Sequence, residues 1–235
     1  MTLELTYDLR AGLVLLAAIV LMSKLGYWLA FRVPALQQMR ELNRAEDKLR
    51  IEKEKYPPII RQNRIIGLAF YGVFFLAIAP FCVSLAPQAL WAALLDGVLI
   101  LMVYDFVYYL THRFVFHGPL LLKVHGLHHQ ARDPSHIDAF YVHPVETVIG
   151  IALFMGTIVG LYFVLGTFHA LTVALCFVIF VQINTINHTK VELPYFPFRT
   201  LTWITRKHHV HHVDMQKGNY ATITLLFDKL FGTFE

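Results

Sequence analysis

Cysteine is nearly absent from this chain of 235 residues, which contains only Cys82 and Cys176. Both lie in long apolar stretches, so the sequence supports neither a disulfide framework nor a metal site built on thiolates. Charged residues are also scarce, at 15% of the chain, and we find no glycine-rich phosphate loop and no internal repeat. These shortages argue against disulfide-stabilised proteins and thiolate metal domains, and they leave the apolar content as the dominant signal.

Apolar residues make up 57% of the chain and the mean hydropathy is +0.54, which is far too high for a water-soluble domain of this size. A helix crosses a hydrocarbon core of about 30 Å with about 20 apolar residues. We therefore predict an all-α integral membrane protein with about five transmembrane helices and a cytoplasmic helical cap. The predicted spans cover residues 11–31, 65–85, 89–110, 147–166 and 168–186.

The segment between the first two spans is basic. Residues 32–64 hold nine Lys and Arg against five acids, an excess that equals the whole net charge of +4. Basic runs are also typical of nucleic-acid binding, but here the charges alternate in sign at helical spacing between two spans. We interpret the segment as a cytoplasmic linker helix and expect no nucleic-acid partner. The positive-inside rule then places the N-terminus outside and the C-terminus in the cytoplasm.

Histidine is abundant, with 13 residues, and nine of them lie in three clusters and at one isolated position. With the predicted topology, all nine fall on the cytoplasmic side. They are His112, His117, His125, His128, His129, His188, His208, His211 and His212.

Two clusters share the pattern HxxHH, at residues 125–129 and 208–212. On a helix this spacing puts three rings on one face, so we expect the three nitrogens of each motif to converge on one site. His112 and His117 are five residues apart, about 140° around an ideal helix. We expect this pair to straddle a helix end or to approach the metals from two sides.

Nine imidazoles are more than one closed site needs, because structural zinc takes four ligands. Burying so many rings without a shared partner would leave many donors and acceptors unpaired. The set therefore predicts two metal ions with open coordination positions, and all-nitrogen ligation suits zinc, iron or copper.

The remaining histidines have simpler interpretations. We expect His136, His169 and His209 to be satisfied core side chains. His143 fits two roles equally well, a tenth metal ligand or the cap of the helix that begins at Pro144.

Several polar residues are predicted to orient the rings or to lie beside the cofactor: Asp105, Tyr109, Asn187, Asp214, Asn219 and Asp228. Asp105 lies two helical turns before His112. A carboxylate at that depth in a membrane is costly unless it is paired, so we expect Asp105 to face inward and bond a histidine or a tyrosine hydroxyl. Asp228 fits equally well as a solvated turn residue.

The motifs together resemble one family. The chain contains, in order, HRFVFH (112–117), HGLHH (125–129), NHT (187–189), HHVHH (208–212), NY (219–220) and FDKLFGTF (227–234). This series is similar to that of the sterol desaturase and fatty acid hydroxylase superfamily of membrane di-iron enzymes. The likeness covers about residues 100–235 and agrees in motif order, spacing and number of spans.

The resemblance implies that the nine clustered histidines bind two iron ions, although zinc can occupy such a site in a structure. It implies an enzyme that uses O₂ to hydroxylate or desaturate an unactivated C–H bond of a membrane lipid. No cytochrome b5-like or flavin-binding segment is present in these residues, so we expect an external electron donor of the ferredoxin or cytochrome b5 type. Fatty-acyl hydroxylases of this group usually have a histidine at the position of Asn184, which favours a sterol-like or other membrane lipid here.

We expect two parts in the chain. Residues 1–100 hold the N-terminal spans with the basic linker, and residues 101–235 form the catalytic domain. Gly156 and Gly160 form a GxxxG pattern, which is typical of close packing within a subunit, our preferred interpretation, or of a homodimer. The lack of a C-terminal retrieval signal favours a bacterial inner membrane over the endoplasmic reticulum.

Two other functions fit parts of the sequence. A membrane metal transporter or metal-binding protein would also carry a cytoplasmic histidine cluster. A transporter, however, needs ionisable ligands along its spans, and Asp96 and Asp105 share one span without clear partners elsewhere. A catalytically inactive relative would be expected to lack some ligands, whereas every cluster is complete.

Overall fold

Five long apolar helices dominate the computed structural model, which describes residues 5–193, 195–196 and 198–235. Each is long and apolar enough to cross a membrane, so the prediction of an all-α membrane protein with about five spans is confirmed. The spans are α1 (Leu9–Arg32), the run of α3 (Tyr56–Val73), η1 (Phe74–Ile78) and α4 (Ala79–Cys82), α5 (Leu90–Thr111) with η2 (His112–Phe116), α7 (Pro144–Leu165) and α8 (Ala170–Asn187).

The second span begins earlier than the sequence predicts, at Tyr56 instead of residue 65. Prolines occupy its first turn, where a missing N–H costs no helical hydrogen bond. Polar residues such as Asn63 are therefore part of this helix and not of the linker. The linker helix itself is α2 (Pro34–Ile51).

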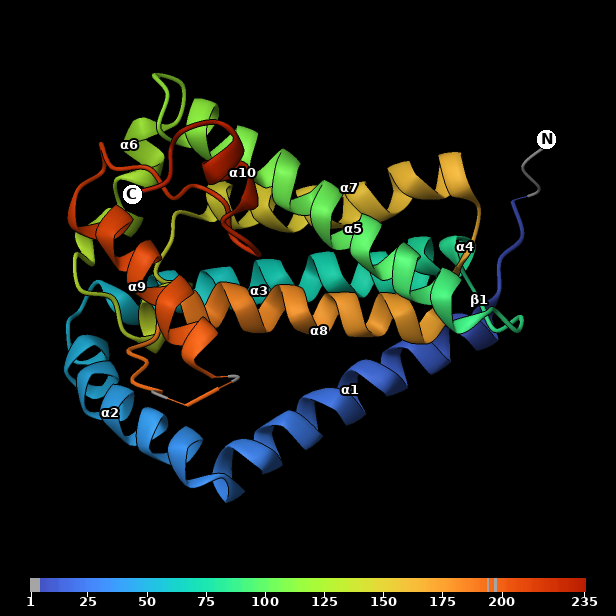
Figure 1. The fold of residues 1–235 in the computed structure, drawn as a ribbon, viewed down its shortest axis with the longest axis horizontal. Coiled ribbons are helices and arrows are strands. Elements are labelled where there is room, and N and C mark those ends of the chain that lie inside the picture. The colour runs from blue at the N-terminus through green and yellow to red at the C-terminus, as the bar shows by residue number, and fades with distance from the viewer. Residues whose placement is uncertain (1–4, 194, 197) are drawn as a thin grey trace.

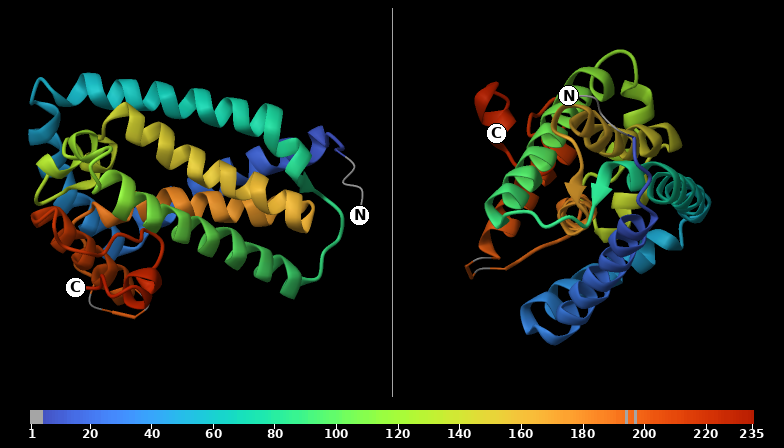
Figure 2. Two further views of the ribbon diagram at one scale, coloured as in Figure 1. Left: turned by 90° about the horizontal axis from the view of Figure 1, so that it is seen from above. Right: turned by 90° about the vertical axis from the view of Figure 1, so that its right-hand side faces the viewer.

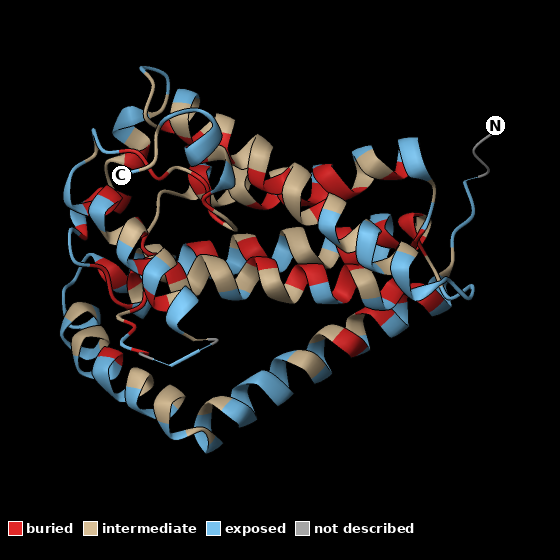
Figure 3. Cartoon of the chain, viewed as in Figure 1, coloured by how far each residue is buried: buried red, intermediate tan, exposed pale blue. Residues whose placement is uncertain are grey.

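Four of the spans, α3, α5, α7 and α8, run side by side along the longest axis, and α1 packs across α8 at an angle (Figures 1 and 2). Aromatic rings fill the interior of this bundle. Phe154 of α7 stacks on Phe180 of α8 with ring centroids 4.3 Å apart, and Tyr104 of α5 meets both rings edge-on. Exposed residues lie on the outward faces of the helices (Figure 3). Many of them are large and apolar, as expected for surfaces that contact lipid.

At one end of the bundle, two short strands and a backbone hydrogen bond join the spans. There β1 (Val83–Ser84) pairs in parallel with β2 (Phe168–His169). The start of α1 is fixed at the same end, because the Asp8 N–H donates to the Pro80 carbonyl at 2.9 Å. Gly12 permits this approach, since a Cβ at that position would lie 2.8 Å from Cγ of Pro80.

The opposite end carries a helical cap. It consists of α2, α6 (Leu122–His125), η3 (His128–Gln130), η4 (His136–Phe140), α9 (Arg199–Val213) and α10 (Leu226–Leu230). The C-terminus lies at this end and the N-terminus at the other (Figure 1). The basic linker helix and the histidine motifs therefore share one end of the bundle.

The GxxxG pattern of α7 does not pack within the subunit. Gly156 and Gly160 are exposed, and a Cβ at either position would meet no heavy atom within 4 Å. The preferred interpretation of the pattern, close packing within one subunit, is therefore wrong, because no described helix covers that face of α7.

Candidate metal centre

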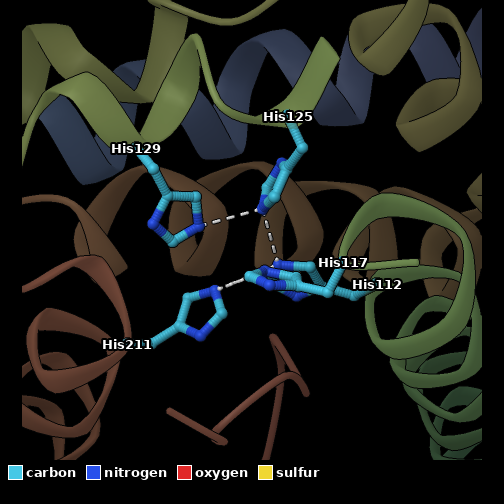
Figure 4. Close-up of side chains that lie close together, drawn as sticks. All are labelled: His112, His117, His125, His129 and His211. Atoms are coloured by element: carbon cyan, nitrogen blue, oxygen red, sulfur yellow. Dashed lines mark hydrogen bonds between the residues drawn. The ribbon is translucent and has the colours of Figure 1, made fainter. Parts of the chain in front are cut away.

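Nine histidine rings converge in the cap and form two groups, each of which could hold a metal ion. In both groups the ligand atoms lie within 4.8 Å of one another. Figure 4 shows the rings of one group turned toward a common centre. We define the five-histidine group as His112, His117, His125, His129 and His211, and the four-histidine group as His128, His188, His208 and His212. The structure thus brings together all nine histidines that the sequence singles out.

Each HxxHH motif divides its rings between the two groups, so the expectation that three rings share one site is wrong. In both motifs the first and third histidines join one group and the middle histidine joins the other. On α9, His211 points about 100° away from His212 by the helical period. That angle is wide enough for one helix to serve two adjoining sites.

His112 and His117 both lie in the five-histidine group because the chain between them forms a π-helix, η2. The His117 N–H donates to the His112 carbonyl at 3.0 Å, which closes an i→i+5 turn. Such a turn brings residues five apart to the same side of the helix, and single π turns occur often at functional sites. The 140° separation expected for an ideal α-helix therefore does not apply.

Backbone carbonyls fix the tautomers of two rings in the five-histidine group. Nδ1 of His112 lies 2.7 Å from the Tyr220 carbonyl, and Nδ1 of His211 lies 3.0 Å from the Gly218 carbonyl. A carbonyl can only accept, so each Nδ1 carries the proton and each Nε2 has a lone pair. The two Nε2 atoms lie 3.2 Å apart. Two lone pairs at that distance repel each other unless a cation lies between them, so the donor set fits a metal ion.

The four-histidine group is anchored in the same way. The Nδ1–H of His188 donates to the Asn184 carbonyl at 2.8 Å, and that of His212 donates to the Ala131 carbonyl at 3.0 Å. Nε2 of His188 then lies 2.9 Å from Nε2 of His128 and 3.0 Å from Nε2 of His208. All four rings are buried. Four ring nitrogens again converge in a buried space.

Burial keeps these rings neutral, which is the form that binds a metal. It lowers the pKa of His117 to about 3, with repulsion from His211 adding to the effect. It also lowers the pKa of His188 and of His211 to about 4, although backbone carbonyls partly oppose the shift at both rings.

Asp105 faces inward as expected, but it bonds neither a histidine nor a tyrosine. Its Oδ1 accepts the N–H groups of Thr222 and Ile223 at 2.9 and 2.8 Å. Its Oδ2 accepts both the N–H and the hydroxyl of Thr224 at 3.0 and 2.7 Å. The carboxylate therefore fixes the loop of residues 214–225, whose carbonyls orient His112 and His211.

Asp228 supports the same loop from the other side. It is fully buried and accepts the N–H groups of Tyr220 and Ala221 at 2.8 and 2.9 Å. Burial raises its pKa, while these hydrogen bonds act in the opposite direction. The alternative of a solvated turn residue is therefore wrong. Asp214, in contrast, is exposed, and its carboxylate accepts the N–H of Gln216.

The other polar candidates tie elements together and do not touch the histidine rings. The Tyr109 hydroxyl accepts from Arg113 at 2.6 Å and lies 3.2 Å from the Thr233 hydroxyl. Asn187 donates to the Thr222 carbonyl at 2.8 Å. Asn219 has a positive φ of 66° and joins the carbonyls of Lys207 and Glu235, at 3.0 and 3.1 Å.

Sequence reasoning missed Glu146. This residue lies in the first turn of α7, is buried, and places Oε1 3.0 Å from Nδ1 of His125. A carboxylate beside Nδ1 of a ligand ring is typical of metal sites, where it helps to orient the ring. The signal was present in the sequence, because an isolated acid at the start of an apolar span is costly without a partner.

The four remaining histidines lie outside both groups. Nδ1 of His143 accepts the Val145 N–H at 3.2 Å and caps α7, which supports the capping alternative. His169 caps α8 in the same way. His136 is exposed beside Asp47, and His209 is only partly buried. The interpretation of His136, His169 and His209 as core side chains is therefore wrong.

The N-terminal region supports the four-histidine group through α2. The Arg50 guanidinium lies 3.0 Å from the buried Asp138 carboxylate, and the Tyr56 hydroxyl donates to the same carboxylate at 2.7 Å. Asp47 accepts from Ser135 and Ile137 at 2.8 and 3.0 Å. These contacts hold residues 131–143, the segment whose first carbonyl orients His212.

Residues 97–233 match the family described as fatty acid hydroxylase, which is more than half of the chain. The chain belongs to the fatty acid hydroxylase family. Its resemblance to the wider sterol desaturase and fatty acid hydroxylase superfamily is thereby confirmed.

Within this fatty acid hydroxylase family, the chain is 31% identical to methylsterol monooxygenase 1 of Rattus norvegicus over 133 residues, which cover 55% of the chain and 43% of that protein. It is 30% identical to a very-long-chain aldehyde decarbonylase of Oryza sativa over 211 residues, covering 79% of the chain and 74% of that protein. The chain spans about half the length of the methylsterol monooxygenases that it matches. No solved structure matches it.

Proposed function

We propose that the protein is a membrane-bound, O₂-dependent, non-haem di-iron oxidoreductase that hydroxylates or desaturates an unactivated C–H bond of a lipid. The convergence of nine imidazoles in two adjoining groups carries this proposal. The relatives' names, a methylsterol monooxygenase and a very-long-chain aldehyde decarbonylase, support a lipid substrate. The asparagine at position 184 favours a sterol-like or other membrane lipid over a simple fatty-acyl chain.

In this proposal each histidine group holds one iron ion. Iron bound there would supply the reduction of O₂ and the oxidation of the C–H bond. The chain's own residues prepare the site: backbone carbonyls hold the Nδ1 protons of His112, His188 and His211, so that their Nε2 lone pairs face inward. Glu146 lies beside Nδ1 of His125. Neutral rings leave the positive charge of the metals uncompensated, and burial of the groups keeps bulk water away.

We further propose the following organisation. Residues 101–235 carry the chemistry, and residues 1–100 add spans and the supporting helix α2. The histidine end faces the cytoplasm, because α2 is basic and lies at that end. Electrons come from a separate ferredoxin or cytochrome b5 type protein. The outward face of Gly156 and Gly160 is available for a homodimer.

Lipid mass spectrometry tests the function. Cells that express the wild-type chain should accumulate a lipid changed by +16 or −2 mass units relative to cells that express His128→Ala, and the change should require O₂. A difference of +16 indicates hydroxylation and one of −2 indicates desaturation.

The transporter alternative makes a different prediction. Proteoliposomes that contain the protein should take up no iron or zinc, since Asp105 is engaged by loop N–H groups and is not available as a ligand in the span. Metal uptake without any change in lipids would contradict the enzyme proposal.

A further inference from the structure

A pocket of about 630 Å³ opens beside the five-histidine group, between η2, α6 and the 214–225 loop. Among the residues that line it are Arg113, Phe114, His117, Leu122, Lys123 and Tyr220. Its volume is in the range of pockets that bind small molecules. It is therefore large enough to hold part of a lipid.

His117 gives this pocket access to the candidate metal centre. It is the one histidine of the nine that is not fully buried. Its Nε2 lies 3.2 Å from Nε2 of His211, so the ring forms both a wall of the pocket and a side of the five-histidine group. A molecule bound here therefore lies beside the five-histidine group.

The lining is positively charged and has no acid. Arg113 donates to the Tyr109 hydroxyl at 2.6 Å and lies over the ring of Phe114, 5.0 Å from its centroid. In the described part of the chain, neither Arg113 nor Lys123 has a carboxylate within ion-pair distance. Two cations without a protein counter-ion favour an anionic ligand.

The rim of the pocket is apolar. Phe114 belongs to η2, the last turn of the third span, and its ring is exposed, as are Leu120 and Leu122 in the following segment. Apolar side chains beside Arg and Lys at the end of a span are typical of the membrane boundary, where cations reach the headgroup level. The pocket thus combines an apolar edge with two cations.

We propose that this pocket binds the anionic end of an amphiphilic substrate, with the carboxylate or phosphate of the lipid held by Arg113 and Lys123. This inference rests on the proposed function and narrows its substrate class from membrane lipids in general to lipids with an acid group. Because the cations and His117 line one pocket, the oxidised carbon lies close to the charged end of the lipid and not at the end of its tail.

Binding to purified, zinc-loaded protein in neutral detergent tests the proposal without turnover. Titration calorimetry would compare decyl phosphate, decanol and inorganic phosphate. Decyl phosphate should bind about tenfold more tightly than decanol, which corresponds to one charge-assisted hydrogen bond. Inorganic phosphate should bind much more weakly than decyl phosphate.

Variants make the test specific. Arg113→Gln and Lys123→Gln should each reduce the preference for decyl phosphate over decanol. Lys123 is exposed, so its variant keeps the test valid if Arg113→Gln fails to fold. Lys53→Gln is the matched control, because Lys53 is an exposed cation at the same end of the bundle and should leave the preference unchanged.

Three results would overturn the proposal. The first is equal binding of decyl phosphate and decanol by the wild-type protein. The second is inorganic phosphate binding as tightly as decyl phosphate, which would make the pocket a site for free anions. The third is a Lys123→Gln variant that binds decyl phosphate normally but, in its iron-loaded form, accepts electrons more slowly from an acidic donor protein. A failure of the proposed function would appear separately, as unchanged lipids in the cell experiment.

Discussion

The two histidine groups use the same ligand type, yet different parts of the chain hold them. The five-histidine group depends on the 214–225 loop, which Asp105 and Asp228 fix through backbone N–H groups. The four-histidine group depends on residues 131–143, which Asp47 and Arg50 of α2 fix. The difference shows that the N-terminal helix α2, although outside the family match, supports half of the centre.

The groups also differ in exposure. His117 of the five-histidine group is partly exposed, whereas every ring of the four-histidine group is buried. In the proposed enzyme the first group is therefore the one that substrate approaches, and the second is enclosed.

Removing one ligand from each group should have the largest effect. His128→Ala and His211→Ala should each abolish turnover, a loss of more than about 100-fold, and each should lower the metal content by one ion. His209→Ala is the control on the same helix as His211, and it should reduce turnover less than either of these variants. Metal analysis and lipid product formation check these outcomes.

The double variant His128→Ala with His211→Ala tests the division between groups most sharply. If the two residues serve different ions, the double variant should bind none. A double variant that still binds one ion would mean that both residues serve the same site. If His209→Ala loses as much turnover as His211→Ala, the wrong face of α9 has been assigned to the metals.

Changes to the residues that fix the two supporting segments should each weaken one metal site and not the other. The effect should be smaller than that of losing a ligand. Asp105→Ala leaves three N–H groups and one hydroxyl without their acceptor, and should lower the unfolding free energy by about 3 kcal/mol. Because the 214–225 loop then loosens, affinity for one metal should fall about 10- to 100-fold. Metal titration of the variant, with His211→Ala as reference, checks that the affected ion belongs to the five-histidine group.

Arg50→Ala is the counterpart for the four-histidine group. It leaves Asp138 buried without its cation, which should lower the unfolding free energy by about 3 kcal/mol. The affinity for the ion of the four-histidine group should fall by a factor similar to that for Asp105→Ala. Lys53→Ala, an exposed neighbour, is the matched control. If Asp105→Ala and Arg50→Ala weaken the same ion, the two groups are not held independently.

Sequence patterns revealed the spans and the nine histidines, but not how the rings are distributed. The first HxxHH pattern fits an uninterrupted helix in the sequence, whereas α6 ends at His125 and η3 begins at His128. The second pattern does lie within one helix, α9, but its rings still divide between the two groups. The π turn at His112 could not be inferred, because no sequence rule distinguishes it from an α-helix there.

Long-range partners were also hidden from the sequence. Asp105 bonds a loop more than a hundred residues away, and Arg50 bonds a segment beyond the third span. Glu146 was detectable as a lone acid in an apolar span, but its contact with His125 depends on how α7 packs against α6.

Acid should destabilise the metal-free protein, because both histidine groups contain rings that the fold keeps neutral. The pKa values of His117, His188 and His211 are lowered to about 3, 4 and 4 in the fold, against about 6.5 in an unfolded chain. Protons therefore bind the unfolded state more readily, and stability falls as the pH drops from about 6.5 toward 4. Thermal unfolding in neutral detergent from pH 8 to pH 4 measures this, and His188→Gln should reduce the slope. A stability that rises with acid would contradict the buried neutral rings.

The smallest expected effect comes from His143→Ala. Since His143 caps α7 and lies outside both groups, its loss should cost no more than about 1 kcal/mol of unfolding free energy. The metal content should stay unchanged. Loss of an ion from this variant would restore His143 as a tenth ligand.

The iron content of the wild-type protein tests the central claim most directly. After anaerobic reconstitution with ferrous iron and removal of excess metal, elemental analysis against protein concentration should give two iron ions per chain. One ion per chain, or none in a fully loaded preparation, would contradict the assignment of the two histidine groups to two metal sites.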